Sequence, residues 1–332
     1  MKKYLISPEG TFYKANLHCH TTWSDGAMTS EEIKKRYMEK GYSIVAFTDH
    51  CLMIPRHKEL SDENFLALNA YENEIRSVDP EAPTRRRCCH LCFISLKEDN
   101  ITMPYYAPKS LWGNGIKNAS YARFNKDHAL EEWDYTPEFV NRVIRLAKQQ
   151  GFFVTYNHPG WSVERYPQYS QYAGMDAMEI FNYDCILGGY GDHNPRVYED
   201  FLELGQRIFA IGTDDCHLPI HVGGSWTMIK APSLQYESVT NALVRGDFYA
   251  SNGPEIQELW MEEGKVHIRN SEARRITCSF PKRRPLILTA ADMLLTEAEF
   301  PILPSDGWFR LTVEDENGCF AHTNAYFTDE VL

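Results

Sequence analysis

Length, composition and charge define the class of protein. The chain has 332 residues, and its 34 Lys+Arg against 46 Asp+Glu give a net charge of −12 with histidine neutral. Hydrophobic residues make up 43% and charged residues 24%, which is typical of a globular protein and excludes extensive disorder. Because an acidic protein repels a phosphate backbone, this charge disfavours a nucleic-acid partner.

No targeting segment is evident in the sequence. The first ten residues hold too few apolar side chains for a signal peptide, and no stretch approaches the roughly 20 apolar residues of a membrane span. The nine cysteines are scattered along the chain, and we interpret them as reduced thiols. We therefore expect a cytoplasmic protein without a membrane partner; the sequence makes no prediction about its oligomeric state.

Short β-rich runs alternate with amphipathic helices over the first 250 residues. The capping box Thr29-Ser-Glu-Glu32 predicts a helix that ends before Gly41. Two more helices are predicted to start at Thr136-Pro137 and Asn194-Pro195, with glycines at 151 and 205 as their ends, and a last helix over 238–245. The strands predicted in chain order are Tyr42–Thr48, Ala67–Ile75, His90–Leu96, Phe152–Tyr156, Ala177–Tyr183 and Arg207–Ile211.

This alternation indicates an α/β fold with βα units around a parallel sheet or barrel. The turn Ser251-Asn-Gly-Pro254 marks a boundary, because short runs typical of strands follow it, at 286–288, 309–313 and 325–327. We predict two domains, residues 1–253 and a small β-sandwich-like module over 254–332. The long polar and aromatic segment Lys97–Tyr135 has no clear period, and it is either a lid or binding loop or a packed surface excursion.

The motif His18-Cys19-His20 follows a strand-like run. In an extended backbone both imidazoles leave the same face, which is a geometry that chelates metal ions. Cys19 then points the other way and is better interpreted as a small core residue. Asp25 lies in the turn that follows and could fold back toward the histidine pair, although alone it would be an ordinary turn aspartate.

Three more histidine motifs stand where predicted strands end. His50 closes Thr48-Asp-His50, His158 follows the strand over 152–156, and Asp215 and His217 follow the strand over 207–211. Functional groups of parallel β/α folds gather at such strand ends. Three coincidences of this kind predict a shared site. The other histidines, at 57, 128, 193, 221, 267 and 322, are better interpreted as solvated or core residues.

The ordered series resembles the PHP (polymerase and histidinol phosphatase) family over roughly residues 14–253. The resemblance implies a distorted (β/α)7 PHP-type barrel that binds two or three divalent metal ions in its mouth. It also implies the metal ligands, which are His18, His20, Asp25, His50, Glu72, His90, His158, Asp215 and His217. In the family's arrangement one metal takes residues 18, 20, 72 and 215, a second takes 25, 50 and 217, and a third takes 72, 90 and 158.

Two of these ligands have competitors nearby. The family glutamate follows a Gly-aromatic pair, so Ala70-Tyr71-Glu72 fits best, whereas Glu74 lies on the same strand face and is the alternative. The DxH spacing favours Asp215 over Asp214. Asp49 is either a partner for a ligand imidazole or the cap of the following turn.

Mixed imidazole and carboxylate ligands suit Zn, Mn or Fe ions. Clustered ions of this kind lower the pKa of a bridging water toward ~7 and supply a hydroxide for phosphoester cleavage. We therefore predict a metal-dependent phosphatase or phosphodiesterase that acts on a small phosphorylated molecule. Candidate substrate-binding residues are Arg196, Arg165 and His193, while the arginine run at 85–87 is better interpreted as a solvated loop.

Two rival hypotheses remain open. The same pocket could hydrolyse a carbamate, amide or ester, because the β-rich tail resembles PHP-related proteins that include a carbamate hydrolase branch. Alternatively, the domain is a non-catalytic scaffold or a nuclease like the polymerase-linked PHP domains. The complete ligand series and the charge of −12 argue against this second rival.

Overall fold

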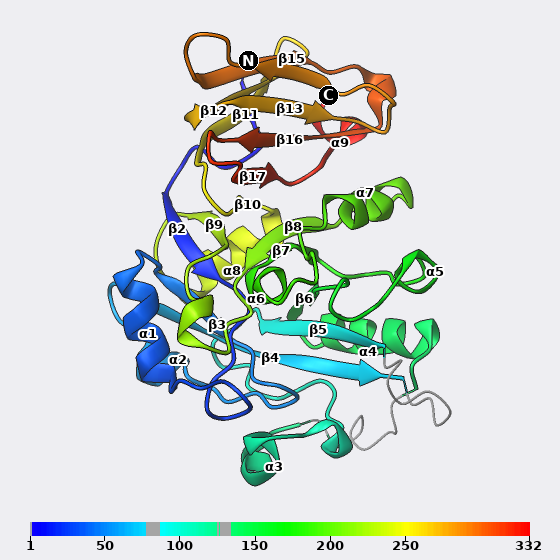
Figure 1. Cartoon of the computed structure of the whole chain (residues 1–332). Helices are drawn as coiled ribbons and strands as arrows, with labels where there is room; N and C mark the ends of the chain where they lie inside the picture. The colour runs from blue at the N-terminus through cyan, green and yellow to red at the C-terminus, as the bar shows by residue number, and fades with distance from the viewer. Residues whose placement is uncertain (1, 78–86, 125, 127–133) are drawn as a thin grey trace.

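Two β-sheets carry the fold of this chain (Figure 1). The computed structural model describes residues 2–77, 87–124, 126 and 134–332. The smaller sheet has the order β1 (Lys3–Tyr4), β11 (Ile256–Glu262), β12 (Lys265–Ala273) and β15 (Leu295–Pro301). In Figure 1 this sheet lies at the top of the molecule, where both chain termini also lie.

The larger sheet runs through both halves of the molecule. Its strands in spatial order are β14 (Leu286–Thr289), β13 (Arg275–Ser279), β16 (Trp308–Glu314), β17 (Phe320–Thr323), β10 (Phe248–Ser251), β9 (Trp226–Ala231), β2 (Thr11–Asn16), β3 (Ile44–Phe47), β4 (Leu66–Arg76), β5 (Cys88–Ser95), β6 (Phe152–Tyr156), β7 (Ala177–Asn182) and β8 (Phe209–Thr213). A further short strand, β18 (Tyr326–Phe327), pairs with β16.

The α helices of the described residues connect these strands. In chain order they are α1 (Ser30–Glu39), α2 (His57–Leu60), α3 (Asn114–Asn118), α4 (Pro137–Gln149), α5 (Tyr166–Tyr169), α6 (Tyr183–Leu187), α7 (Pro195–Glu203), α8 (Tyr236–Arg245) and α9 (Thr328–Val331). Short 3-10 turns lie at Pro108–Ser110, Ala119–Tyr121, Pro219–His221 and Pro304–Asp306. No helix in this part of the chain is long and apolar enough to cross a membrane.

The predicted helix ends are confirmed. The Thr29 side chain accepts from the backbone of Glu32, whose carboxylate accepts from the backbone of Thr29, so α1 begins with the predicted capping box. At the start of α4 the Thr136 side chain alone is the cap, and it accepts from the Phe139 amide. Glycine 246 ends α8 with a left-handed backbone (φ 75°), a conformation that glycine adopts without strain.

The mixed α/β class is confirmed, but the sheet is not all parallel. β3 is parallel to β2 and β4, whereas β5 is antiparallel to both β4 and β6, and β9 is antiparallel to β2. β4 ends at Arg76 and β5 begins at Cys88. This connection is shorter than the dozen or more residues that a parallel crossover needs, which explains the antiparallel pairing.

The large sheet curls until β8 lies next to β9. The Thr227 hydroxyl donates to the Gly212 carbonyl at 3.0 Å and accepts from the Gly212 amide at 3.1 Å. A Cβ atom on Gly212 would lie 2.7 Å from the Trp226 carbonyl oxygen, so glycine permits this approach. No ladder of backbone hydrogen bonds joins β8 to β9 in the described residues, so a closed barrel is not observed.

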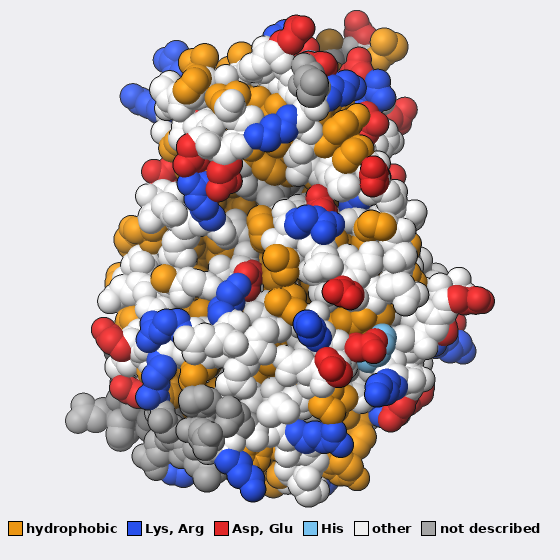
Figure 2. Space-filling model, turned by 180° about the vertical axis from the view of Figure 1, so that it is seen from behind, with side chains coloured by type: hydrophobic (Ala, Val, Ile, Leu, Met, Phe, Trp, Pro, Cys, Tyr) orange, Lys and Arg blue, Asp and Glu red, His pale blue; other side chains and the backbone are white. Residues whose placement is uncertain are grey.

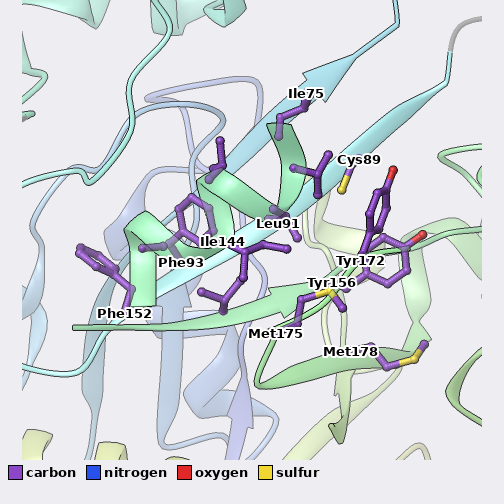
Figure 3. Packing of buried hydrophobic residues seen from close by; sticks show 14 of the residues in the cluster. Ile75, Cys89, Leu91, Phe93, Ile144, Phe152, Tyr156, Tyr172, Met175 and Met178 are labelled. Atoms are coloured by element: carbon purple, nitrogen blue, oxygen red, sulfur yellow. The ribbon is translucent and has the colours of Figure 1, made fainter. Parts of the chain in front are cut away.

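Helix α4 covers β5 and β6 with its apolar stripe. Its buried residues include Val140, Val143, Ile144 and Ala147, as the sequence predicts. Figure 3 shows Ile144 in the same group of buried side chains as Leu91 and Phe93 of β5. Because this helix packs on one face of the strands, it fixes the position of β5 and β6, whose other side chains face the site described below.

The C-terminal strands form two packed layers. Leu259, Val266 and Ile268 of the small sheet pack against Ile276 and Leu311 of the large sheet in one buried cluster. The predicted boundary at 253/254 stays a prediction. The N-terminal strand β1 pairs with β11, and β10 pairs with β17, so strands from both sides of this position share both sheets.

Candidate metal centre

The residues predicted as metal ligands converge on one buried cluster. They come from the ends of β2, β3, β6 and β8, from the middle of β4 and β5, and from the turn after β2. Isolated backbone β-bridges pair Cys19 with Cys216 and His50 with Glu72, and they hold these segments side by side. The curled sheet therefore brings together side chains that are up to 199 positions apart, from His18 to His217.

Glu72 lies at the centre of the cluster. Its Oε1 atom is 2.8 Å from His90 Nδ1, 3.1 Å from His158 Nε2 and 3.3 Å from His18 Nε2. Its Oε2 atom is 2.9 Å from His50 Nδ1. The competitor Glu74 lies at the edge of the cluster, with its Oε1 atom 3.7 Å from His90 Nε2.

Asp215 faces the predicted histidine pair. Its Oδ1 atom is 3.1 Å from His20 Nε2 and 3.3 Å from His18 Nε2, while the two imidazole Nε2 atoms are 3.1 Å apart. Asp214 points elsewhere: it accepts from the Tyr37 hydroxyl and from the backbone amides at 223, 224 and 225. Asp215 therefore belongs to the site, whereas Asp214 holds the loop over residues 223–225.

Asp25 joins the opposite side of the cluster. Its Oδ2 atom is 3.2 Å from His217 Nε2 and 3.8 Å from His50 Nε2, and its Oδ1 atom is 3.5 Å from His20 Nδ1. Asp49 holds this turn in place, because its carboxylate accepts from Ser24 and Thr21 and from no imidazole of the described residues. Both predictions for Asp49 are wrong in detail: within the described residues its carboxylate bonds neither an imidazole nor the turn that follows it, but caps the earlier turn of Thr21 and Ser24.

Three groups of these side chains can hold a metal ion, because their ligand atoms lie within 4.8 Å of one another. The groups are His20, Asp25, His50 and His217; His18, His158 and Asp215; and His50, Glu72 and His90. They share the members expected from the resemblance but divide them differently. His20 joins the Asp25 group, and His158 joins His18 and Asp215.

Several atoms of the cluster are buried without a hydrogen-bond partner, which is the pattern expected of a set of metal ligands. They are His20 Nδ1, His50 Nδ1, His90 Nε2, Glu72 Oε2 and Asp215 Oδ1. His50 Nδ1 and Glu72 Oε2 lie 2.9 Å apart, yet their orientation does not form a hydrogen bond. Since leaving buried polar atoms unpaired is costly, the donor set fits ions that such lone pairs would bind.

A buried carboxylate that the sequence reading missed orients His18. Glu179 of β7 lies 2.7 Å from His18 Nδ1 through its Oε1 atom, which also accepts from Thr213. Its other oxygen accepts from the His158 amide and from Asn182. Because the Nδ1 atom of His18 faces Glu179, its Nε2 atom faces the cluster, which is the usual arrangement of a ligand imidazole. Glu179 sits inside a strand, and no motif marks it.

Sulfur atoms also border the cluster. Cys92 forms a candidate group with His18 and Glu72, and Cys88 forms one with Glu74 and His90. Residues 88, 90 and 92 alternate along β5, so their side chains share the face that looks into the site. Cys19, in contrast, packs with Ile33 in a separate hydrophobic cluster, which confirms its predicted core role.

The electrostatics of the cluster are dominated by its carboxylates. Burial alone would raise the pKa of Glu72, but His90, His18 and His50 lower it well below its ordinary value. Burial lowers the pKa of His20 to about 3, helped by His217 and His50 nearby. Burial opposes the charged form of His18 as well, yet Asp215 and Glu72 raise its pKa well above the ordinary value. The site therefore attracts positive charge.

Two site residues adopt a left-handed backbone. His158 has φ 24° and Asp215 has φ 51°, and neither is glycine. Such conformations cost about 1–3 kcal/mol each and persist where the surroundings fix them. Here Glu179 accepts from the His158 amide, and Asp215 lies in the loop that bridges to Cys19. In this conformation His158 faces Glu72, and Asp215 faces the histidine pair.

The cluster opens into a cavity of about 160 Å³. Its lining includes Trp112, Trp161 and Asp184 in addition to the candidate ligands. No lysine or arginine of the described residues lines it. Asp184 lies 3.2 Å from His217 Nδ1 and 3.3 Å from His221 Nε2, so it orients His217 from the rim.

The three predicted substrate-binding residues lie elsewhere. Arg196 is exposed on α7 and pairs with Asp200, and the Arg165 guanidinium donates to the backbone carbonyl of Glu164. His193 packs against the C-terminal strands, with its ring 4.5 Å from that of Phe181. None of the three lines the cavity. Residues 85, 86 and 128 lie outside the described residues.

The comparisons with known proteins support a family assignment for one part of the chain. Residues 16–93 match the PHP domain. A segment of 68 residues is 49% identical to the DNA polymerase/3'-5' exonuclease PolX of Bacillus subtilis. This segment is 20% of the chain and spans 11% of that relative's length.

Solved structures resemble the chain more broadly but at low identity. A two-domain protein from Bacteroides vulgatus, described as containing a predicted PHP-like metal-dependent phosphoesterase, aligns over 98% of this chain and 99% of its own, with 16% identity and a TM-score of 0.47. The lesion-specific endonuclease PfuEndoQ from Pyrococcus furiosus aligns over 70% of this chain and 56% of its own, with 13% identity and a TM-score of 0.43.

Proposed function

We propose, on the premise that residues 16–93 match the PHP domain, that the chain is a metal-dependent hydrolase that cleaves phosphoesters of a small molecule. One observation carries the proposal. Buried nitrogen and oxygen atoms of His20, His50, Glu72, His90 and Asp215 face one cluster without hydrogen-bond partners. Metal binding accounts for these unpaired buried atoms, whereas side-chain packing does not.

The proposed cofactors are two or three divalent ions, with Zn, Mn or Fe favoured by the mixture of imidazoles and carboxylates. Divalent ions in such a site act as Lewis acids on the phosphoryl group and make water a better nucleophile at neutral pH. The proposed ligands are the nine residues that resemble the family series, and Glu72 would be available to more than one ion because both of its oxygens face imidazoles.

The chain's own residues orient these ligands. Glu179 holds His18, and Asp184 holds His217, each through the Nδ1 atom that faces away from the cluster. The carboxylates of Glu72, Asp215 and Asp25 would offset the charge of the ions. Since no lysine or arginine of the described residues lines the cavity, a phosphate group would be recognised by the ions.

We also propose how the chain is divided into domains and what it binds. Residues 1–253 would form the distorted (β/α)7 barrel of the family, and residues 254–332 a β-sandwich-like module. The curl of the large sheet at Gly212 and Thr227 supports the first part, and the shared core of the two C-terminal layers supports the second. The proposed partner is a small phosphorylated substrate, without nucleic acid or membrane. Figure 2 shows acidic and basic side chains interspersed over one face of the molecule.

A screen of phosphoesters tests the proposed function. The protein is loaded separately with Zn, Mn and Fe(II) and assayed with aryl phosphate mono- and diesters. We expect hydrolysis with at least one metal, and loss of it after chelation and in the Glu72→Gln variant. Full activity in Glu72→Gln, or no hydrolysis by fully loaded protein, would contradict the proposal.

A second candidate function is hydrolysis of a carbamate, amide or ester. The absence of lysine and arginine from the described cavity lining favours it, because a neutral carbonyl group needs no guanidinium partner. Parallel assays with aryl carbamates and aryl phosphates on the same metal-loaded protein separate the two reactions. Turnover of the carbamate alone would replace the phosphoesterase assignment.

A further inference from the structure

Two tryptophans flank the mouth of the candidate metal centre. The ring of Trp112 lies 4.8 Å from that of His50, and the ring of Trp161 lies 5.2 Å from that of His90. The His50 and His90 rings are themselves 5.5 Å apart, so the indoles stand at the two ends of this histidine pair. No direct contact joins the indoles in the described part of the chain, and both line the cavity.

Both indoles keep a large exposed surface beside a deeply buried site. Trp112 is 40% exposed and Trp161 is 38% exposed, whereas His90 is 2% exposed. Tryptophan is highly buried on average in folded proteins, so exposure near 40% leaves an unusually large part of the side chain in solvent. Two such indoles at one cavity mouth offer apolar surface that a ligand would cover.

Hydrogen bonds hold the backbone that carries each indole. Asp192 accepts from the Trp161 and Gly160 amides, each at 2.8 Å. The loop of Trp112 is tied to the turn that carries Asp25: the Asn114 amide donates to the Ser24 carbonyl at 3.0 Å, and its side chain donates to Thr22. Surfaces held in this way lose little freedom when a ligand binds.

From this arrangement we infer that the substrate carries a planar aromatic ring, which Trp112 and Trp161 bind beside the scissile group. The inference rests on the proposed function and specifies its substrate class. Aromatic rings stack or pair edge to face, so two exposed indoles at one cavity mouth offer faces and edges to a planar ring. The cavity of about 160 Å³ lies against the candidate ligands, so the ring is held at its mouth, where the indoles are exposed.

The lining of the cavity argues for a substrate with few anionic groups. Asp184 stands at the rim, and no lysine or arginine of the described residues faces the cavity. A substrate with several phosphates would leave some of them without a cationic partner. Affinity beyond the scissile group would then come from the ring.

A matched pair of substrates tests the inference. Benzyl phosphate and cyclohexylmethyl phosphate have similar size and leaving groups and differ in aromaticity. We expect a KM for benzyl phosphate that is roughly 2- to 10-fold lower, as the strength of aromatic pairs implies. In Trp112→Leu and Trp161→Leu this ratio falls toward about 1, whereas Trp→Phe at either position retains most of it. Tyr166→Leu, an exposed aromatic residue outside the cavity, leaves the ratio unchanged.

A binding measurement separates this inference from the proposed function. Benzylphosphonate and cyclohexylmethylphosphonate are not hydrolysed, and calorimetry on the metal-loaded protein reports their dissociation constants without turnover. Tighter binding of benzylphosphonate that disappears in the two Leu variants supports the inference even if no phosphoester is cleaved. Equal affinities in the wild type, or a preference that both Leu variants retain, would overturn it.

Discussion

Two buried histidine clusters in this chain have opposite surroundings. In the candidate metal centre the imidazoles face Glu72 and Asp215, and several buried atoms have no hydrogen-bond partner. In the second cluster His193 and His322 meet at 3.0 Å between their Nε2 atoms, beside the buried guanidinium of Arg310. None of these three side chains has an unpartnered buried atom.

The second cluster is complete without a ligand. Arg310 and Thr312 donate to His322 Nδ1, so the Nε2 atom of His322 carries a proton and donates to His193. Arg310 also pairs with Glu199 at 2.6 Å. The comparison teaches that histidine content alone does not distinguish the clusters: carboxylates and unpaired buried atoms mark the candidate metal centre, whereas a neighbouring cation and satisfied hydrogen bonds mark packing.

Removal of the central carboxylate should have the largest effect. Replacement Glu72→Gln leaves the volume but removes a charge and a lone-pair donor that face four imidazoles. Replacing a residue that only orients a metal ligand lowers metal affinity or activity about 10–100-fold. Because Glu72 is itself a proposed ligand, we expect loss of metal and a fall in kcat/KM of at least about 100-fold. Glu74→Gln on the same strand face is the control and should cost less. Equal metal content in wild type and Glu72→Gln would refute the central role of Glu72.

Replacement of an orienting carboxylate should have an intermediate effect. Glu179→Gln keeps a hydrogen-bond acceptor near His18 but removes its negative charge. We expect metal affinity to fall about 10–100-fold, measured by competition with a chelator. Thr213→Val removes only one donor to Glu179 and should produce a smaller loss. Unchanged affinity in Glu179→Gln would place Glu179 among purely structural residues.

The second cluster should make stability depend on pH. Burial and the nearby Arg310 lower the pKa of His193 to about 4, against about 6.5 in an unfolded chain. Between these values the unfolded state binds more protons, so the free energy of unfolding falls as pH decreases from about 6.5 to 4, by on the order of 3 kcal/mol.

Urea denaturation of chelator-treated protein at pH 7.5 and pH 5 measures this dependence. His193→Gln should reduce the difference between the free energies of unfolding at the two pH values, and His267→Gln on the small sheet is the control. If His193→Gln retained the whole pH dependence, the acid sensitivity would belong to other groups.

The exposed arginine should have the smallest effect. Arg196 pairs only with Asp200 of its own helix among the described residues and does not line the cavity. Exposed pairs of this kind contribute about 0–1 kcal/mol. We expect Arg196→Ala to change kcat/KM less than about 2-fold in a steady-state assay. A loss above about 10-fold would restore Arg196 as a substrate-binding residue.

The sequence predicts the helix ends, because they depend on local patterns, and motifs at the ends of strands predict that several histidines gather in one place. Capping at Thr29 and Thr136 and termination at Gly246 follow from backbone chemistry within a few residues. The convergence of His18 with His158 and His217 follows from the ends of strands. These features need no knowledge of the tertiary structure.

The remaining features depend on contacts between distant residues. Glu179 and Asp184 orient histidines that lie 161 and 33 positions away, and no local motif marks either carboxylate. His193 was predicted to reach the mouth, but its ring stacks on Phe181 and pairs with His322 of β17. The antiparallel direction of β5 also escaped the prediction, since the pattern of a buried strand is the same in either direction.

The most direct test of the metal centre is elemental analysis of protein purified without chelators, with the Glu72→Gln variant beside it. We predict two or three Zn, Mn or Fe ions per wild-type chain and a clear reduction in the variant. Near-zero metal in the wild type, persisting after reconstitution with each of these ions, would show that the unpaired ligand atoms do not form a metal site.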